Sequence, residues 1–196
     1  MRTRDTNKEN SIREQAIEMI VKEGLDGFSM QKLAKAANVS PATLYIYYKD
    51  RDDLITQIAT EISLRLMESS LRGMHPKMSF AEGMELQWKN RLKFYLEHQL
   101  EIEFIEQIRY SSLYETIRQV IRAKFGDTLG SFVMNAINRG ELVPLPFEVY
   151  WAIAFAPLYQ LIKFHSQGRS HANDAFNISD DLVDMTLKLV LKALKP

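Results

Sequence analysis

The chain has 196 residues, of which 46% are hydrophobic and 26% are charged, and its 25 basic and 25 acidic side chains cancel. This composition is ordinary for a soluble globular protein of one or two domains, and the balanced charge argues against a protein that coats nucleic acid non-specifically. The absence of cysteine excludes disulfides, thiolate metal sites and thiol nucleophiles.

The sequence also lacks the marks of a targeting or membrane segment. Residues 1–10 are polar and contain no apolar stretch of the kind that a secretory signal needs. The longest stretch without a strongly polar side chain, residues 149–159, is too short for a bilayer span, which takes roughly 20 residues. We therefore expect a soluble, cytoplasmic protein with no membrane partner.

Apolar residues recur with the period of an α-helix along the chain, and no stretch alternates as a surface strand does. We predict an all-α fold of about nine helices, with a three-helix, helix-turn-helix domain over residues 1–53 and a helical bundle over residues 54–196. The predicted helices cover residues 10–23, 29–37, 40–47, 50–70, 80–97, 99–109, 112–139, 147–166 and 179–194.

The second and third predicted helices are joined by only two residues, Asn38 and Val39. A helix-turn-helix needs a sharp turn at this point, and Asn is one of the few residues besides Gly that tolerates left-handed backbone angles. Val39 is expected to point back into the core. Ser40 is a good N-cap, and Pro41 suits the first helical position, where its missing N–H costs nothing.

The charge of this segment differs from that of the whole chain. Residues 27–49 contain three lysines (Lys32, Lys35, Lys49) and no acidic side chain, as a surface that faces phosphate requires. Small and hydroxylated residues begin the third helix, and the phenols of Tyr45 and Tyr47 can donate to phosphate oxygens. The alternative is an ordinary helical hairpin in which these aromatics belong to the core or the surface.

The segment GFSMQKLAKAANVSPATLYIYYKDRDDLI resembles the N-terminal signature of the TetR/AcrR family of bacterial transcriptional regulators. The match covers about a quarter of the chain without gaps, and Val39-Ser40, Thr43-Leu44-Tyr45 and Leu54 fall in register. It departs from the family pattern at the turn, where Asn38 replaces the usual Gly. Tyr48, four residues after Leu44, is expected in the core.

The resemblance implies a repressor that binds double-stranded DNA as a homodimer and leaves a palindromic operator when a small apolar or amphipathic effector binds. It implies no cofactor and no metal. The residues that it places against DNA are Ser29, Gln31, Ser40, Pro41, Ala42, Thr43, Tyr45, Tyr47, Lys49 and Arg51. Gln31 and Thr43 are the two expected to read a base directly.

The remaining helices then correspond to the family's variable ligand-binding and dimerisation domain. The candidate pocket residues are Trp88, Phe94, Tyr95, Phe104, Gln107, Tyr110, Phe132 and Phe155. The last two predicted helices are apolar on more than one face, which suggests burial on both sides. The candidate dimer contacts are Trp151, Leu158, Ile162, Leu187, Val190 and Leu194. Plain core packing in a monomer is the alternative for both sets.

An enzyme is not indicated. The four histidines are scattered, and Glu101, Glu103 and Glu106 fit a solvated helix face better than a di-metal site, which would also need a Glu-x-x-His pattern. A helical interaction module whose helix-turn-helix does not bind DNA is the other alternative, as is, less favoured, an all-helical enzyme.

Overall fold

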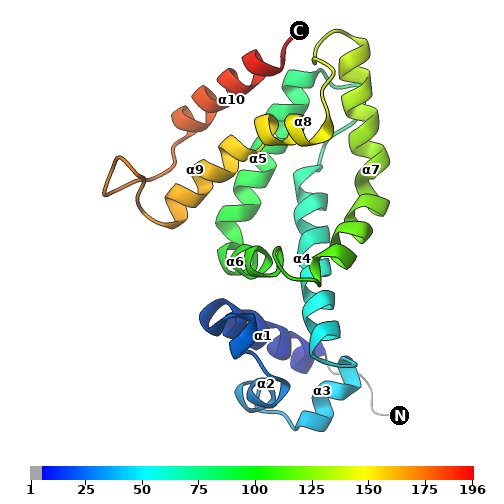
Figure 1. Ribbon diagram of the computed structural model, residues 1–196, viewed down its shortest axis with the longest axis vertical. Coiled ribbons are helices and arrows are strands. Elements are labelled where there is room, and N and C mark those ends of the chain that lie inside the picture. Colours follow the sequence, from blue (N-terminus) through cyan, green and yellow to red (C-terminus); the bar gives the residue numbers. More distant parts are fainter. Residues whose placement is uncertain (1–5) are drawn as a thin grey trace. The chain divides into compact units, whose positions relative to one another are not determined.

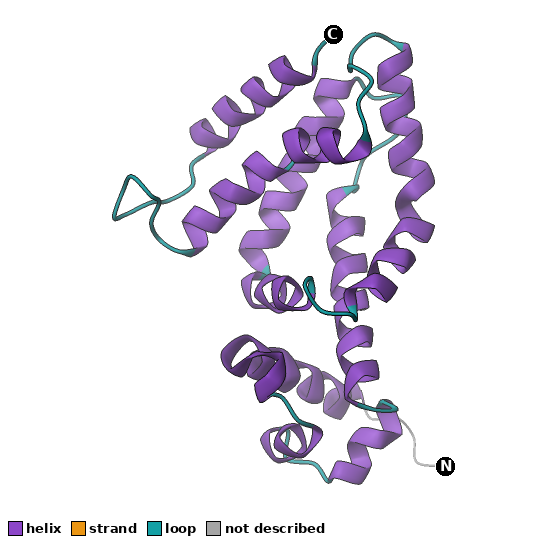
Figure 2. Cartoon of the chain, in the orientation of Figure 1, coloured by secondary structure: helices purple, strands orange, loops and turns teal. Residues whose placement is uncertain are grey.

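The computed structural model describes residues 6–196; residues 1–5, where the predicted polar N-terminal segment begins, lie outside the described residues. Every regular element of the described chain is a helix, which confirms the all-α prediction (Figures 1 and 2). The helices are α1 (Thr6–Gly27), α2 (Met30–Ala36), α3 (Pro41–Tyr47), α4 (Arg51–Ser70), α5 (Phe80–Glu97), α6 (Gln99–Ile108), α7 (Tyr114–Asn138), α8 (Phe147–Ala154), α9 (Ala156–Ser166) and α10 (Asp180–Leu194).

The described chain has ten helices rather than nine because the predicted helix 147–166 is two helices, α8 and α9. Phe155 separates them with φ −127° and ψ −27°, outside the helical range. Pro157 follows in the first turn of α9. Proline has no N–H and its ring clashes with the carbonyl four residues earlier, so it cannot continue α8 but is tolerated at a helix start.

Serine side chains begin three of the helices, as the sequence predicts. Ser29, Ser40 and Ser179 each accept a hydrogen bond from the backbone N–H three residues later, at the starts of α2, α3 and α10. Each such cap contributes about 1 kcal/mol because it satisfies a backbone donor that the helix itself leaves unpaired.

The chain divides into two compact units that are discontinuous in sequence. The head unit comprises residues 6–65 and 98–124, and the body unit comprises residues 66–97 and 125–196. The division into sequence domains that we place after residue 53 stays a prediction.

In the head unit, α1 packs against α6 and α2, and α2 packs against α3. One continuous apolar core joins these helices, and fully buried members include Ile12, Ile20, Leu33, Leu44 and Phe104. The core fixes how α3 is held, because Leu44 and Tyr47 are buried in it while the opposite side of the helix faces outward.

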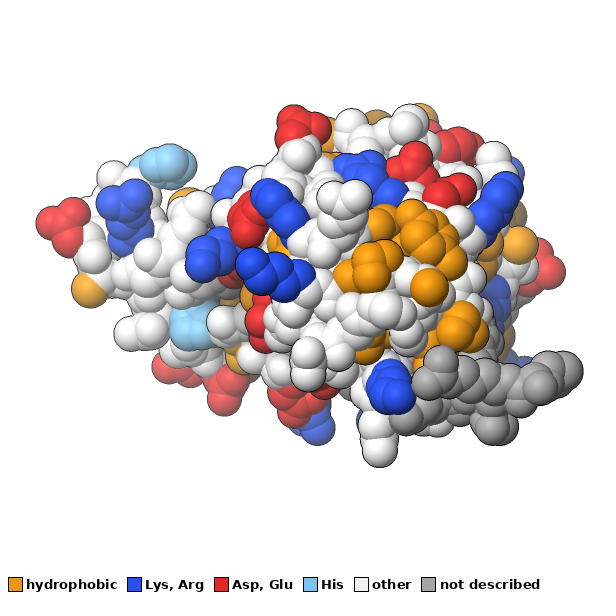
Figure 3. All heavy atoms as spheres, turned by 90° about the horizontal axis from the view of Figure 1, so that it is seen from below, with side chains coloured by type: hydrophobic (Ala, Val, Ile, Leu, Met, Phe, Trp, Pro, Cys, Tyr) orange, Lys and Arg blue, Asp and Glu red, His pale blue; other side chains and the backbone are white. Residues whose placement is uncertain are grey.

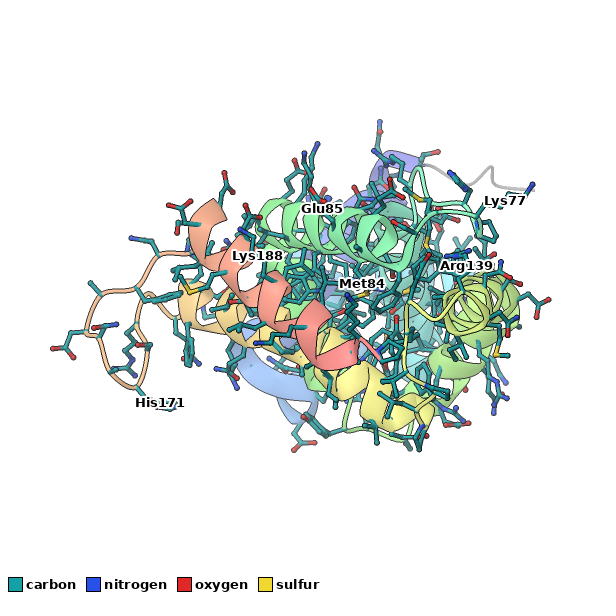
Figure 4. The ribbon with its side chains drawn as sticks, turned by 90° about the horizontal axis from the view of Figure 1, so that it is seen from above. Lys77, Met84, Glu85, Arg139, His171 and Lys188 are labelled. Atoms are coloured by element: carbon teal, nitrogen blue, oxygen red, sulfur yellow. The ribbon has the colours of Figure 1, made fainter. Side chains whose placement is uncertain are left out.

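In the body unit, α8, α9 and α10 pack on one another, and α5 packs against α9. Figure 4 shows Met84 of α5 among these helices, whereas His171 lies out on the loop between α9 and α10. The backbone of α5 comes close to α7 at Gly83, where a Cβ atom would lie 2.4 Å from two ring carbons of Phe132. Only glycine fits this approach.

Candidate nucleic-acid interface and buried polar site

The turn between α2 and α3 is a Schellman motif. The N–H of Val39 donates to the carbonyl of Ala34 at 2.9 Å, and the N–H of Asn38 donates to that of Lys35 at 3.2 Å. Asn38 has φ 52° and is the one non-glycine residue with positive φ in the described chain. This geometry confirms the predicted left-handed turn, and asparagine adopts it where glycine is commonest.

The residues after the turn hold α3 against the core. Val39 packs against the head core, and Leu44 and Tyr48 are buried in it, as the sequence predicts. Tyr47 is buried as well, so its ring belongs to the core, and its expected contact with phosphate stays a prediction that depends on the hydroxyl alone.

The outer face of α3 is small and apolar. Ser40, Pro41 and Ala42 are exposed, and Tyr45 and Ile46 expose 56% and 46% of their surface. Figure 3 shows hydrophobic side chains gathered on one face of the molecule with Lys and Arg side chains beside them. The sequence analysis did not include Ile46 in this surface. Helical spacing could have identified it, because Ile46 does not lie on the side of the helix that Leu44 and Tyr47 bury.

Two of the hydroxyls predicted to meet DNA are already engaged within the helix. Ser40 Oγ accepts from the N–H of Thr43 at 3.2 Å and lies 2.9 Å from Thr43 Oγ1. Thr43 is half-buried, whereas Gln31 on α2 is exposed. Of the two side chains expected to read bases, Gln31 is therefore the more accessible.

Residues 27–49 contain no acidic side chain, but one from outside this segment lies beside it in the fold. Lys32 Nζ forms an ion pair with Glu23 of α1 at 2.9 Å and donates to the carbonyl of Gly27 at 2.8 Å. Lys35 and Lys49 are both exposed. The positive charge that this surface presents therefore rests on Lys35 and Lys49 more than on Lys32.

Arg51 connects the start of α4 to α1. Its Nη2 donates to the carbonyl of Leu25 at 2.6 Å, its Nη1 donates to Asp52 Oδ1 at 2.8 Å, and the guanidinium lies 5.9 Å from the centroid of the Phe28 ring. These contacts give Arg51 an anchoring role in the head unit that the sequence did not suggest. Its contact with phosphate stays a prediction.

Two aspartates cap α4. Asp50 Oδ1 accepts from the N–H of Asp53, and Asp53 Oδ2 accepts from the N–H of Lys49, both at 2.8 Å. Gln57 also donates to Asp53 at 2.9 Å. These hydrogen bonds, that of Gln57 first, hold the pKa of Asp53 below its usual value because they favour the ionised carboxylate.

The predicted pocket residues do not form one group. Trp88, Phe94, Tyr95, Phe132 and Phe155 are buried in the body unit, but the other three belong to the head unit. There, Phe104 packs in the head core, Gln107 donates its amide to the carbonyl of Val21 at 3.1 Å, and Tyr110 is 88% exposed. An exposed ring cannot line an enclosed pocket. The set of candidate pocket residues is therefore reduced to the five that are buried in the body unit.

The body unit buries two polar side chains of α5, Gln87 and Arg91. Arg91 is 1% exposed and Gln87 is fully buried. Arg91 Nη1 donates to the hydroxyl of Tyr159 at 2.8 Å, but its Nε and Nη2 have no hydrogen-bond partner, and neither does either amide atom of Gln87. The signal was present in the spacing, because Met84, Gln87, Trp88 and Arg91 recur at helical intervals along one face.

Aromatic rings surround the Arg91 guanidinium. It lies 4.5 Å from the ring centroid of Phe155 and 5.4 Å from that of Trp151. Cation–π contacts of this kind contribute about 2 kcal/mol when desolvated. A buried donor left without a partner costs about 1–3 kcal/mol, and the rings give the two unpaired nitrogens no hydrogen-bond acceptor of the usual kind.

Tyr150 lies in the same buried region of the body unit. Burial raises the pKa of Tyr150 to about 12, and the charge of Arg91 opposes that rise only in part. Trp88 satisfies its indole N–H by donating to the carbonyl of Ala154 at 2.8 Å. Trp88 is therefore paired, whereas Arg91 and Gln87 keep polar atoms without a hydrogen-bond partner.

The predicted dimer contacts face inward. Trp151 is half-buried, and the others are buried in their own chain: Leu158, Ile162, Leu187, Val190 and Leu194. A side chain packed inside its own unit offers no surface to a second copy, so the assignment is revised for the five buried residues, and that of Trp151 stays a prediction. On α10 the exposed apolar side chains are Met185 and Leu189, at 59% and 63%.

Among the described residues, no three His, Asp or Glu side chains are grouped so that they could hold a metal ion. No described helix is both long enough and apolar enough to cross a membrane.

The capped two-helix turn on a helical body makes this a helix-turn-helix protein. Residues 12–58 match the family described as "Bacterial regulatory proteins, tetR family". A TetR family transcription regulator from Marinobacter aquaeolei has a crystal structure that matches 100% of this chain and 99% of its own, with a TM-score of 0.84 and 25% identity. Residues 12–58 therefore match the TetR family, and the chain as a whole shares the fold of a TetR family regulator.

Two curated relatives match over shorter stretches. An HTH-type transcriptional regulator of Haemophilus influenzae is 32% identical over 113 residues, which span 58% of this chain and 59% of that protein. The fatty acid metabolism regulator protein of Bacillus subtilis is 23% identical over 130 residues, 65% of this chain and 66% of that protein.

Proposed function

We propose that this protein is a sequence-specific DNA-binding transcriptional repressor that acts as a homodimer and is released from a palindromic operator by a small apolar or amphipathic effector. A DNA partner supports a cytoplasmic location for it. The observation that carries the proposal is the outer face of α3, which is exposed, free of acid and fixed by the Asn38 turn.

The chemistry of this face suits the major groove of DNA. Exposed Ala42 and Ile46 can contact thymine methyl groups, and Gln31 can form two hydrogen bonds with adenine. Lys35, Lys49 and the hydroxyl of Tyr45 supply contacts to phosphate, which position the protein but carry little sequence information. Because few of these side chains can read a base edge, we expect DNA shape and deformability to contribute to specificity.

A homodimer follows from the modest size of this reading face, because two heads related by a two-fold axis read two half-sites of a palindrome. We place the dimer contact on the exposed side of α10, at Met185 and Leu189. Large apolar side chains exposed on one helix are typical of a surface that another protein covers.

The test is a fluorescence-anisotropy titration of the full-length protein on a duplex obtained by selection, repeated over a range of salt concentrations. Lys49→Ala should weaken binding about equally on all sequences and lower the salt slope by about 2, since a dimer loses two phosphate contacts. Gln31→Ala should change the preference at one position of each half-site. Lys163→Ala, an exposed change on α9, is the matched control. Equal effects of Lys49→Ala and Lys163→Ala would count against the assigned surface.

A further inference from the structure

The unpaired polar atoms of α5 lie in the part of the protein where an effector is expected. Arg91 and Gln87 are one turn apart on the same face of α5, and both are more than nine-tenths buried. Together they present four nitrogen or oxygen atoms without a hydrogen-bond partner. Buried polar groups in native proteins are nearly always paired, so this cluster requires an explanation.

The described residues offer Arg91 no anionic partner. The contacts of the Arg91 guanidinium are the Tyr159 hydroxyl and the rings of Phe155 and Trp151, and no carboxylate pairs with it among the residues that the structure describes. An arginine cannot lose its proton to escape the cost of burial. An anion from outside the chain would balance this buried charge.

The geometry points to an effector site for an organic monocarboxylate with an apolar body, in which Arg91 and Gln87 bind the carboxylate. The guanidinium offers Nε and Nη2 on one edge, the pair of donors that matches the two oxygens of a carboxylate. The Gln87 amide adds a further donor. This inference rests on the proposed function, because it gives the chemical class of the effector.

The apolar body is indicated by what surrounds the two polar groups. The buried neighbours on α5 are Met84 and Trp88, and Phe155 closes the other side. A small hydrated anion would gain nothing from these surfaces, whereas an aliphatic or aromatic chain buries apolar area against them. Trp151 and Tyr159 are the half-buried contacts of Arg91, so we place the entry path beside them.

The two tryptophans of the chain are Trp88 and Trp151, and both lie beside this site. Intrinsic fluorescence therefore reports binding without a label. The probes are decanoate and 4-phenylbutyrate, which share a carboxylate but differ in the body, and 1-decanol as the neutral counterpart of decanoate. We expect at least one acid to give a saturable signal at sub-millimolar concentration, with 1-decanol about tenfold weaker or more.

The variants separate charge from packing. Arg91→Met keeps a long side chain without the charge and should weaken the acid about tenfold or more, with circular dichroism confirming its fold. Lys89→Met, on the exposed side of the same helix, should leave binding unchanged. If Arg91→Met does not fold, Gln87→Leu replaces it and should also weaken the acid. No saturable signal from either acid, equal binding of 1-decanol, or equal binding by Arg91→Met or its replacement would overturn the inference.

DNA binding by the protein without effector is measured in parallel, which keeps the two proposals apart. Palindrome binding with no response to either acid would remove the carboxylate site and leave the regulator. Acid binding that depends on Arg91 in a protein with no affinity for duplex DNA would support the site and remove the regulator. Acid binding that lowers the affinity for DNA would support both.

Discussion

The left-handed turn at Asn38 allows a prediction whose size follows from the backbone. A residue with a Cβ atom pays about 1–2 kcal/mol at positive φ, and asparagine pays less because its short polar side chain can bond locally. Asn38 has φ 52°. We therefore expect Asn38→Ala to lower the free energy of unfolding by about 1 kcal/mol.

Asn38→Gly should behave differently. Glycine adopts this conformation without strain, but it loses about 0.5–1 kcal/mol through the greater freedom of the unfolded chain. The two effects nearly cancel, so we expect the glycine variant to match the wild type. Asn177→Ala changes an exposed loop asparagine that has no positive φ and is the control, with an expected effect within about 0.5 kcal/mol.

Urea unfolding followed by far-UV circular dichroism gives the comparison. With a slope of about 2 kcal/mol/M, the alanine variant should unfold at a urea concentration about 0.5 M lower than the wild type. The reasoning fails if Asn38→Ala is as stable as the wild type. It also fails if the glycine and alanine variants lose the same stability, because strain at positive φ would then not be the cause.

Three further predictions concern packing, pH and assembly. Gly83→Ala should destabilise the body unit by about 1–3 kcal/mol, because the added Cβ atom would overlap the buried Phe132 ring. Urea unfolding followed by tryptophan fluorescence should show a lower midpoint, and an unchanged midpoint would contradict this. The lowered pKa of Asp53 stabilises the fold above the pKa of an unfolded aspartate, and this contribution disappears as the pH falls through the folded value. Asp53→Asn should therefore lose less stability between about pH 7 and pH 3 than the wild type, and an identical pH profile would refute the assignment. Leu189→Glu should convert a dimer to monomer in sedimentation velocity, whereas the nearby Lys188→Glu should not; a dimer that survives Leu189→Glu would move the interface elsewhere.

Local features of the fold were predictable because their causes are local. The serine caps, the left-handed Asn38 and the burial of Tyr48 follow from residue type and helical spacing. The break at Phe155 was missed because the apolar pattern runs through it without interruption, although Pro157 gives the signal.

The assignment of side chains to a surface or an interior was less predictable. A helix that is apolar on several sides does not reveal which side its own chain covers, so Leu187 was taken for a dimer contact although it is buried. Tyr110 and Phe104 lie six residues apart, yet one is exposed and the other packs in the head core. The burial of Arg91 could not be predicted from its neighbours in sequence, because it depends on contacts with α8, α9 and Phe155, which come much later in the chain.

The most direct test of the central claim is a selection of the full-length protein against random duplex DNA at moderate salt. The account predicts enrichment of a palindrome with two equivalent half-sites, and loss of that enrichment when Ala42 and Ile46, both on the outer face of α3, are replaced by Glu. A pool that stays random after repeated rounds, or a palindrome that is enriched equally by the Glu variant, would contradict the claim that α3 reads DNA.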